Sequence, residues 1–292
     1  MGNSNKSKPK EWPITCERYV AFLDIMGFKA MVSKKSHGEI YLMMKGLKTH
    51  TRKIESINWS SEPTTDLIRV TTYSDSIILY TRDASGFAFE TLVLTVASLT
   101  SRMLRDGIPH KGAISRGMMT LDTVDDIFFG QPLIDAYELA DELLMYAVTF
   151  HSTAFPPLQI NESKNLIGAG IIIQYLTPFK GGASKNYLCI PLHSAILGEE
   201  TKKNTDLIKS IDVFRGQTSG QLGKYVDNTE AFISQCRKYE IVNFRAANEI
   251  SFANNDCSSK RLDIFPSNEI NHLNILGITA RNDNRPNNSQ NE

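Results

Sequence analysis

Residues 66–83, DLIRVTTYSDSIILYTRD, constrain the fold more than any other segment of the chain. Two short runs of apolar and β-branched residues flank the polar centre Tyr73-Ser74-Asp75-Ser76. This pattern predicts two antiparallel strands joined by a tight turn. The chain is therefore expected to contain a β-hairpin with Asp75 at or next to its turn.

Another strand is predicted at residues 19–24, where an apolar run ends on Asp24 and Gly27 follows in a turn. Two interpretations of Asp24 stay open on this evidence. It is either the N-cap of the following helix, with Gly27 easing the turn, or a carboxylate placed at a functional site.

Helical periodicity follows these strands. Gly38 and Gly46 interrupt the first helical segment, which indicates more than one helix or a bent one. With a short strand expected inside residues 107–119, the order β-α-ββ-α-β-α predicts an α+β fold in which helices cover a mixed sheet. The helical segments are residues 28–57, 87–104 and 132–145.

The second half of the chain predicts a C-terminal α/β extension. Strands are expected at residues 166–176 and 186–192, joined by the Gly-rich basic loop TPFKGGASKN, and a long helix at 230–248. One domain with an extension fits this pattern best. The expected divisions are a flexible tail at 1–15, a core at 16–150, a strand-rich and helical part at 151–280 that completes the domain, and a disordered tail at 281–292.

Composition excludes several classes of protein. The 292 residues carry 32 basic and 32 acidic side chains, so no nucleic-acid or anionic-membrane partner is expected. The four cysteines show no zinc or disulfide spacing, which favours a reducing, cytoplasmic location. The N-terminus lacks the apolar region of a signal peptide, and the apolar run at 166–176 is too short to cross a bilayer.

The chemistry is expected where the strand at 19–24 lies beside the hairpin. Asp24 and Asp75 would then meet at one edge of the sheet, and two close carboxylates need a neutralising cation. Hard oxygen ligands suit Mn²⁺ or Mg²⁺, ions that support displacement at phosphorus. The backbone amides of Ile25, Met26, Gly27 and Phe28, at the start of the next helix, make a seat for phosphate.

Four motifs, FLDIMGF, YSDSIIL, KGAISRG and FFGQPLIDAYELAD, follow one another in the chain. Their order and spacing over about residues 18–145 resembles the nucleotidyl cyclase family, which includes adenylate and guanylate cyclases. The resemblance implies that Asp24 and Asp75 bind two metal ions, with a further contact from the Ile25 carbonyl. It also implies a homodimer that converts a nucleoside triphosphate to a 3′,5′-cyclic nucleotide and pyrophosphate.

The chain departs from the purine cyclases of that family. Ile134 and Glu138 stand where those enzymes carry a transition-state Asn and Arg, and Thr71 stands at a base-reading position that is Lys or Glu in them. The second base-reading position falls near Ile127. The purine-selective set of residues is therefore absent.

The chain is more similar to the stand-alone pyrimidine cyclases of the Pycsar anti-phage systems. That likeness implies a cytoplasmic, Mn²⁺-dependent homodimer that makes cyclic UMP from UTP, or cyclic CMP from CTP. A separate effector that is activated by the cyclic nucleotide would read the product. Two alternatives stay open, namely a purine cyclase and a catalytically inactive nucleotide-binding module.

Four further residues are candidates for the site. Arg116 and Lys180 are candidate phosphate-binding cations, Arg116 toward the triphosphate of either subunit, since a transferring phosphoryl group needs positive charge. Ordinary exposed charges are the alternative. Thr71 and Tyr73 are candidates to meet the base by hydrogen bond and by stacking, and ordinary strand residues are the alternative.

Overall fold

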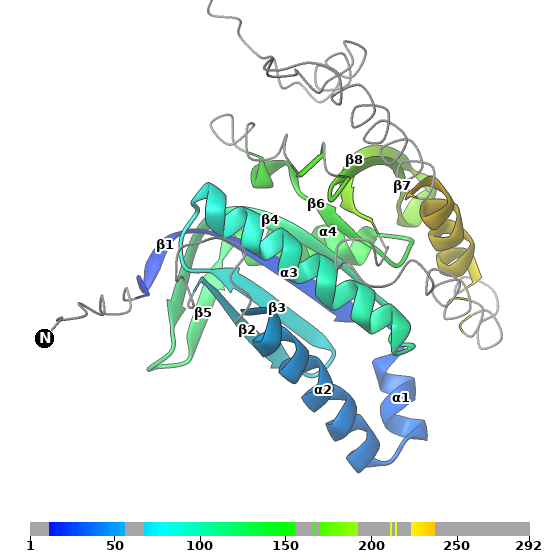
Figure 1. The fold of residues 1–292 in the computed structure, drawn as a ribbon, viewed down its shortest axis with the longest axis horizontal. Helices are drawn as coiled ribbons and strands as arrows, with labels where there is room; N and C mark the ends of the chain where they lie inside the picture. Colours follow the sequence, from blue (N-terminus) through cyan, green and yellow to red (C-terminus); the bar gives the residue numbers. More distant parts are fainter. Residues whose placement is uncertain are drawn as a thin grey trace, which may run out of the picture. The chain divides into compact units, whose positions relative to one another are not determined.

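The computed structural model in Figure 1 shows helices on both faces of one sheet. The chain forms two compact units, residues 1–248 and 249–292, and every residue described below belongs to the first. The predicted tail at 281–292 and most of the tail at 1–15 lie outside the described residues. These are 12–55, 67–155, 166–167, 170–191, 211, 214 and 223–236.

Strands and helices alternate along the first half of the chain, and strands prevail among the described residues that follow. The elements are β1 (Thr15–Ile25), α1 (Phe28–Lys34), α2 (His37–Glu55), β2 (Ile68–Tyr73), β3 (Ser76–Thr81), α3 (Gly86–Arg105), β4 (His110–Asp122), β5 (Ile127–Gly130), α4 (Gln131–Glu142), β6 (Val148–Phe150), η1 (Ser152–Ala154), β7 (Ile173–Pro178), η3 (Lys180–Gly182) and β8 (Ser184–Ile190). Residues 223–236 are also helical.

The sheet has the strand order β2-β3-β1-β4-β6-β8-β7, with β5 paired to β4. Pairing of β4 with β6 is parallel, and the other pairings are antiparallel. The prediction of an α+β fold with a mixed sheet is confirmed. The hairpin predicted at 66–83 is the β2–β3 pair, and β7 and β8 extend the same sheet.

The alternation of side chains along β1 separates two apolar layers. Tyr19, Leu23 and Ile25 pack with α3 and α2 on one face, whereas Phe22 packs with α4 and the helix at 223–236 on the other. α3 is long and apolar enough to cross a membrane, but most of it is buried inside the protein. It therefore has the surroundings of a core helix.

The break in the first helical segment comes from a capping motif and not from glycine. The backbone amide of Ser36 donates to the Glu39 carboxylate (2.8 Å), and the Glu39 amide donates to the Ser36 hydroxyl (3.3 Å). This reciprocal pair starts a new helix at His37. Gly38 and Gly46 lie inside α2, where added Cβ atoms would meet nothing within 4 Å.

Two predicted elements of the second half are wrong in their bounds. Leu166 and Ile167 are helical, and the strand expected at 166–176 runs instead from Ile173 to Pro178. An apolar run does not by itself distinguish a buried strand from a helix. The helix expected at 230–248 is already present at residue 223, and residues 237–248 lie outside the described part of the chain.

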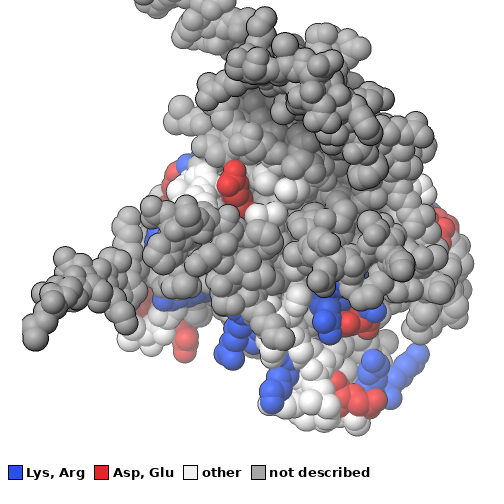
Figure 2. Space-filling model, viewed as in Figure 1, with Lys and Arg blue, Asp and Glu red and all other residues white. Residues whose placement is uncertain are grey.

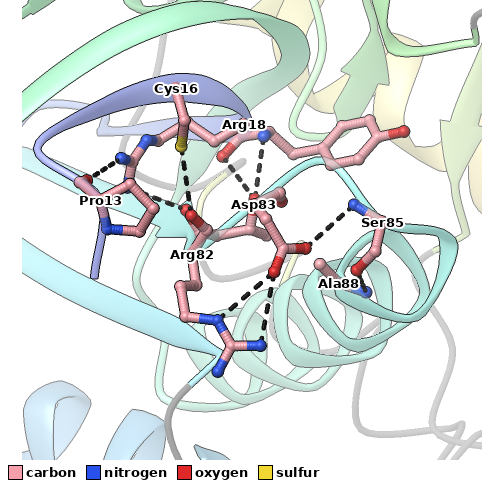
Figure 3. Close-up of polar contacts among 9 residues, drawn as sticks. Pro13, Cys16, Arg18, Arg82, Asp83, Ser85 and Ala88 are labelled. Carbon is pink, nitrogen blue, oxygen red and sulfur yellow. Dashed lines mark hydrogen bonds and ion pairs between the residues drawn. The ribbon is translucent and has the colours of Figure 1, made fainter. Parts of the chain in front are cut away.

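A buried arginine fixes the start of β1, at the end of the strand away from Asp24 (Figure 3). Arg18 is fully buried, and its guanidinium donates to the carbonyls of Thr81 (3.2 Å) and Pro13 (2.6 Å). The Cys16 thiol donates to the Arg82 carbonyl (3.3 Å). These contacts tie β1 to the end of β3, so the register between the two strands is held firmly.

The described surface visible in Figure 2 carries both signs of charge, with Lys and Arg interspersed with Asp and Glu over α1 and α2. Mixed charge of this kind agrees with the zero formal net charge of the chain.

Candidate functional site

Asp24 lies at the end of β1 between two neighbouring strands. It is opposite Ser76 of β3 and opposite Lys111 of β4. Residues directly opposite each other in an antiparallel pair point to the same face of the sheet. Asp24 and Lys111 therefore share the face on which Phe22 and α4 pack.

Asp75 lies in the turn of the β2–β3 hairpin, directly beside Asp24. Ser74 has a positive φ of 54°, a conformation that lets the chain reverse tightly. The Ile25 amide donates to the Asp75 carbonyl (2.8 Å), which holds the turn against the end of β1. The structure thus brings together the two carboxylates that the sequence singled out.

The surroundings of Asp24 raise the pKa of its carboxyl group. Burial is the largest cause, and the nearby carboxylates of Asp75 and Asp141 act in the same direction. Lys111 and Lys180 oppose the shift. Asp24 is therefore a partly desolvated carboxylate in a group of five charged side chains.

Lys111 and Lys180 converge on one carboxylate of α4. The Lys180 ammonium lies 2.8 Å from Oδ1 of Asp141, and the Lys111 ammonium lies 3.6 Å from the same oxygen. Lys111 also donates to the backbone carbonyl of Asp141 (2.6 Å). The structure thus brings the predicted residue Lys180 to the neighbourhood of Asp24.

The hydrogen bond with Lys180 is the largest cause that lowers the pKa of Asp141, and the same bond raises the pKa of Lys180. Burial, together with the charge of Lys180, lowers the pKa of Lys111, while Asp141 and Asp24 favour its charged form. The carboxylates thus favour the charged forms of two cations that face the aspartate pair.

Tyr225 closes this group from the helix at 223–236. The Lys111 ammonium lies 5.9 Å from the centre of its ring, and the ring stacks on Tyr146 at 5.7 Å. Burial raises the pKa of Tyr225. The charge of Lys180 lowers this pKa, and the charges of Asp141 and Asp24 raise it. A residue of the second half of the chain therefore forms one side of the site.

Lys111, Asp141 and Tyr225 were not predicted from the sequence. One signal was available for Lys111, because it opens the motif KGAISRG, and a lysine at the start of a buried strand needs a partner. Asp141 and Tyr225 carry no local signal. Their roles depend on contacts between α4, the β7–β8 turn and a helix distant in sequence.

Arg116 does not belong to this group within one chain. It lies opposite Tyr19, and its guanidinium is 5.9 Å from the centre of the Tyr19 ring and 2.5 Å from the Glu17 carboxylate. Tyr19 and Asp24 point to opposite faces, and Arg116 is five positions from Lys111, about 16 Å along the strand. Of the two subunits whose triphosphate Arg116 was predicted to face, its own is therefore disfavoured, and a role toward a second subunit stays a prediction.

The turn after Asp24 leaves fewer free amides than the sequence suggested. The Ile25 amide is bonded to Asp75, and the Met26 amide donates to the Pro109 carbonyl (2.8 Å). Gly27 has a positive φ of 71° and starts α1 without a side-chain cap. Of the four predicted phosphate contacts, the amides of Gly27 and Phe28 are the ones that these two bonds do not use.

The two candidate base contacts have different environments. The hydroxyl of Thr71 is hydrogen-bonded to that of Tyr80, a buried residue of β3. The Tyr73 side chain is 79% exposed at the end of β2. Thr71 therefore presents a positioned neutral group, whereas Tyr73 makes an exposed ring available.

The donor set fits a metal ion that is shared with a polyphosphate. Among the described residues, no group of three or more His, Cys, Asp or Glu side chains is arranged to hold a metal. Two carboxylates are present at the strand ends, and Mg²⁺-type ions in nucleotide sites take one or two carboxylates with phosphate oxygens as the other ligands. Asp24 and Asp75, with the adjacent Ile25 carbonyl, would hold such ions.

No protein-family model matches the chain, and no curated protein matches it. Among solved structures, the catalytic core of a rhodopsin-guanylyl cyclase with converted specificity, in complex with ATPαS, is 13% identical; the match covers 61% of this chain and 98% of that one, with a TM-score of 0.45. A bacterial light-regulated adenylyl cyclase is 13% identical, covering 68% and 98%, with a TM-score of 0.42. A likeness of this degree says nothing about activity or substrate.

Proposed function

We propose that this protein is a metal-dependent nucleotide cyclase. The observation that carries the proposal is the meeting of Asp24 and Asp75 at one sheet edge, with Lys111 and Lys180 beside them. Two carboxylates and two ammonium groups at one place suit a metal–polyphosphate ligand. The resemblance of the motifs around these residues to nucleotidyl cyclases supports the same reaction.

In the proposed reaction the 3′-hydroxyl oxygen of a nucleoside triphosphate attacks its own α-phosphorus. A bond from O3′ to phosphorus forms, the bond from phosphorus to the bridging oxygen breaks, and pyrophosphate leaves while the hydroxyl proton passes to solvent. Two divalent ions, Mn²⁺ or Mg²⁺, when bound, lower the pKa of the hydroxyl and neutralise the triphosphate.

The residues of the chain have separate roles in binding the ions and the phosphates. Asp24 and Asp75 hold the ions, and Lys111 and Lys180 bind phosphate oxygens and offset the negative charge that moves to the leaving group. The amides of Gly27 and Phe28 supply neutral donors to the same phosphates. Arg116, which faces away in its own chain, has a role in this proposal only toward a second subunit.

We propose UTP as the substrate, with CTP as the second choice. Thr71 replaces the charged base-reading residue of purine cyclases, and its hydroxyl is positioned by Tyr80. Ile134 is 49% exposed on α4, where purine cyclases carry the transition-state Asn, and Glu138 is exposed on the same helix. Ile134 is apolar and Glu138 is anionic, so neither supplies the donors that the purine enzymes use.

The active form proposed is a homodimer. Large apolar side chains are exposed on β5, in the turn before it and on α4, an arrangement that is rare on a free surface of a monomer. Sedimentation velocity at several protein concentrations tests this assembly. The exposed residues are Val124 (89%), Ile127 (47%), Phe128 (37%), Phe129 (61%), Ile134 (49%) and Tyr137 (54%).

The cyclic nucleotide is proposed to be a second messenger in cytoplasmic anti-phage defence, read by a separate effector. This proposal rests on the resemblance to Pycsar cyclases. Co-expression of the chain with a candidate effector, followed by phage challenge, tests it.

Substitution of the aspartates tests the reaction. Asp24→Ala and Asp75→Ala are expected to abolish pyrophosphate release while the thermal unfolding transition is kept. Asp106→Ala is the matched control, because Asp106 is an exposed acid at the end of α3 that pairs with Arg102 (2.7 Å). If either site variant kept near-full turnover, the site assignment would be wrong.

A further inference from the structure

We propose that Asp141 is a built-in counter-ion, which occupies the anion-binding place of Lys111 and Lys180 until a polyphosphate displaces it. The inference rests on the proposed function, which makes these lysines phosphate ligands. One carboxylate oxygen, Oδ1 of Asp141, lies 2.8 Å from the Lys180 ammonium and 3.6 Å from the Lys111 ammonium. An oxygen shared by two ammonium groups holds the position that a phosphate oxygen takes when it binds both.

The ion pair between Lys180 and Asp141 lies where a phosphate can replace the carboxylate at little cost in free energy. The side chains of Lys180 and Asp141 are 41% and 51% exposed, and exposed ion pairs contribute at most about 1 kcal/mol. A phosphate offers several charged oxygens, and hydrogen bonds to them are stronger than neutral ones. A polyphosphate therefore competes well against a single half-exposed carboxylate.

The two lysines are held in different ways, and this favours an exchange of partners over a collapse of the site. Lys111 is only 3% exposed, and the backbone carbonyl of Asp141 accepts from its ammonium at 2.6 Å. This bond stays in place when the Asp141 side chain turns away. Lys180 heads a turn with two glycines at positive φ, Gly181 (82°) and Gly182 (86°), and its side chain is free to follow the phosphate.

The charge of Asp141 affects both the binding of a polyphosphate and the release of pyrophosphate. Asp24 and Asp141 act on Lys111, and Asp141 and Glu142 act on Lys180. The carboxylates therefore outnumber the two ammonium groups. Asp141 lowers the affinity of the site for every anion, and its return to the lysines helps pyrophosphate to leave.

The test measures binding of inorganic tripolyphosphate without metal, at low ionic strength, by isothermal titration calorimetry. Asp141→Asn keeps the shape and the backbone carbonyl, and is expected to bind about four- to tenfold more tightly than wild type, since it removes one negative charge close to the anion. Glu142→Gln removes a charge from the next residue, which is exposed and whose charge also acts on Lys180, so it is expected to tighten binding by less than Asp141→Asn does. Lys180→Met is expected to weaken binding about tenfold.

Each outcome decides the proposal. A gain in affinity that is clearly larger in Asp141→Asn than in Glu142→Gln supports a counter-ion. Weaker binding by Asp141→Asn would mean that the carboxylate positions the lysines, and equal gains in both variants would mean a general field effect; either result overturns the proposal. Tripolyphosphate binding needs no turnover, so the expected pattern without any cyclic product would refute the proposed reaction alone.

Discussion

Lys111→Met removes the buried cation opposite Asp24 and keeps the apolar stem of the side chain. At about 4–5 Å from a phosphate and an effective dielectric constant of about 20, one charge contributes roughly 3–4 kcal/mol of attraction. Desolvation of the ammonium offsets part of this, which leaves about 2–3 kcal/mol in the transition state. The expected loss is therefore about 10²-fold in kcat/KM.

The assay is pyrophosphate release at several substrate concentrations, with thermal unfolding measured on the same preparations. The stability cost is expected to be small, about 1 kcal/mol, because the Asp141 carbonyl loses one hydrogen bond. Lys185→Met is the matched control, since Lys185 is an exposed lysine on β8 and is expected to leave kcat/KM unchanged.

A pH profile gives a second readout of the same substitution. Lys111 lowers the pKa of Asp24 against the effect of burial, so its loss raises that pKa further. Activity that needs ionised Asp24 is then expected to be lost at a higher pH as the solution is acidified. A kcat/KM within about threefold of wild type, with an unshifted acidic limb, would refute the assignment of Lys111 to the phosphates.

Two predictions concern stability. In Gly112→Ala the added Cβ would lie 2.4 Å from the Leu23 side chain and 2.5 Å from the Phe22 carbonyl, so urea denaturation is expected to show a loss of about 2 kcal/mol or more; Gly117→Ala, whose Cβ meets a proline ring at 3.2 Å, should lose less. Burial lowers the pKa of His110 from 6.5 to about 4. Between these values the unfolded chain binds a proton that the folded chain does not, so about 3 kcal/mol of stability should disappear on acidification. His110→Gln should lack this part of the slope, and an identical slope in both proteins would contradict the reasoning.

The local part of the site was predictable from sequence. Asp24 and Asp75 stand at a strand end and in a hairpin turn, and both positions follow from apolar runs broken by polar residues within one short segment. Their meeting required only that β1 lie beside the hairpin. The same local reasoning identified Lys180 through the Gly-rich turn that carries it.

The sequence does not predict which of the two cations of β4, Lys111 or Arg116, lies beside Asp24. The two residues are an odd number of positions apart on β4, so they must point to opposite faces of the sheet. Sequence alone does not say which face Asp24 shares, because that depends on the register between β1 and β4. The structure resolves it by placing Lys111 directly opposite Asp24.

The role of Asp141 was not predictable from the sequence for a different reason. Its partner Lys180 is 39 residues away in sequence, on a turn between two strands whose bounds the apolar pattern misplaced. Contacts of this kind depend on how α4 and the β7–β8 hairpin pack, and no periodicity within either segment encodes them. The strand β6 was missed because three residues are too few to show a pattern.

A product assay on the purified protein tests directly whether it is a pyrimidine nucleotide cyclase. The chain would be incubated with Mn²⁺ and, separately, UTP, CTP, ATP and GTP, and the nucleotides resolved by chromatography against cyclic standards. We expect a 3′,5′-cyclic pyrimidine nucleotide and an equal amount of pyrophosphate. A cyclic purine as the main product would contradict the proposed base preference, and no cyclic product from any of the four would contradict the assignment as a cyclase.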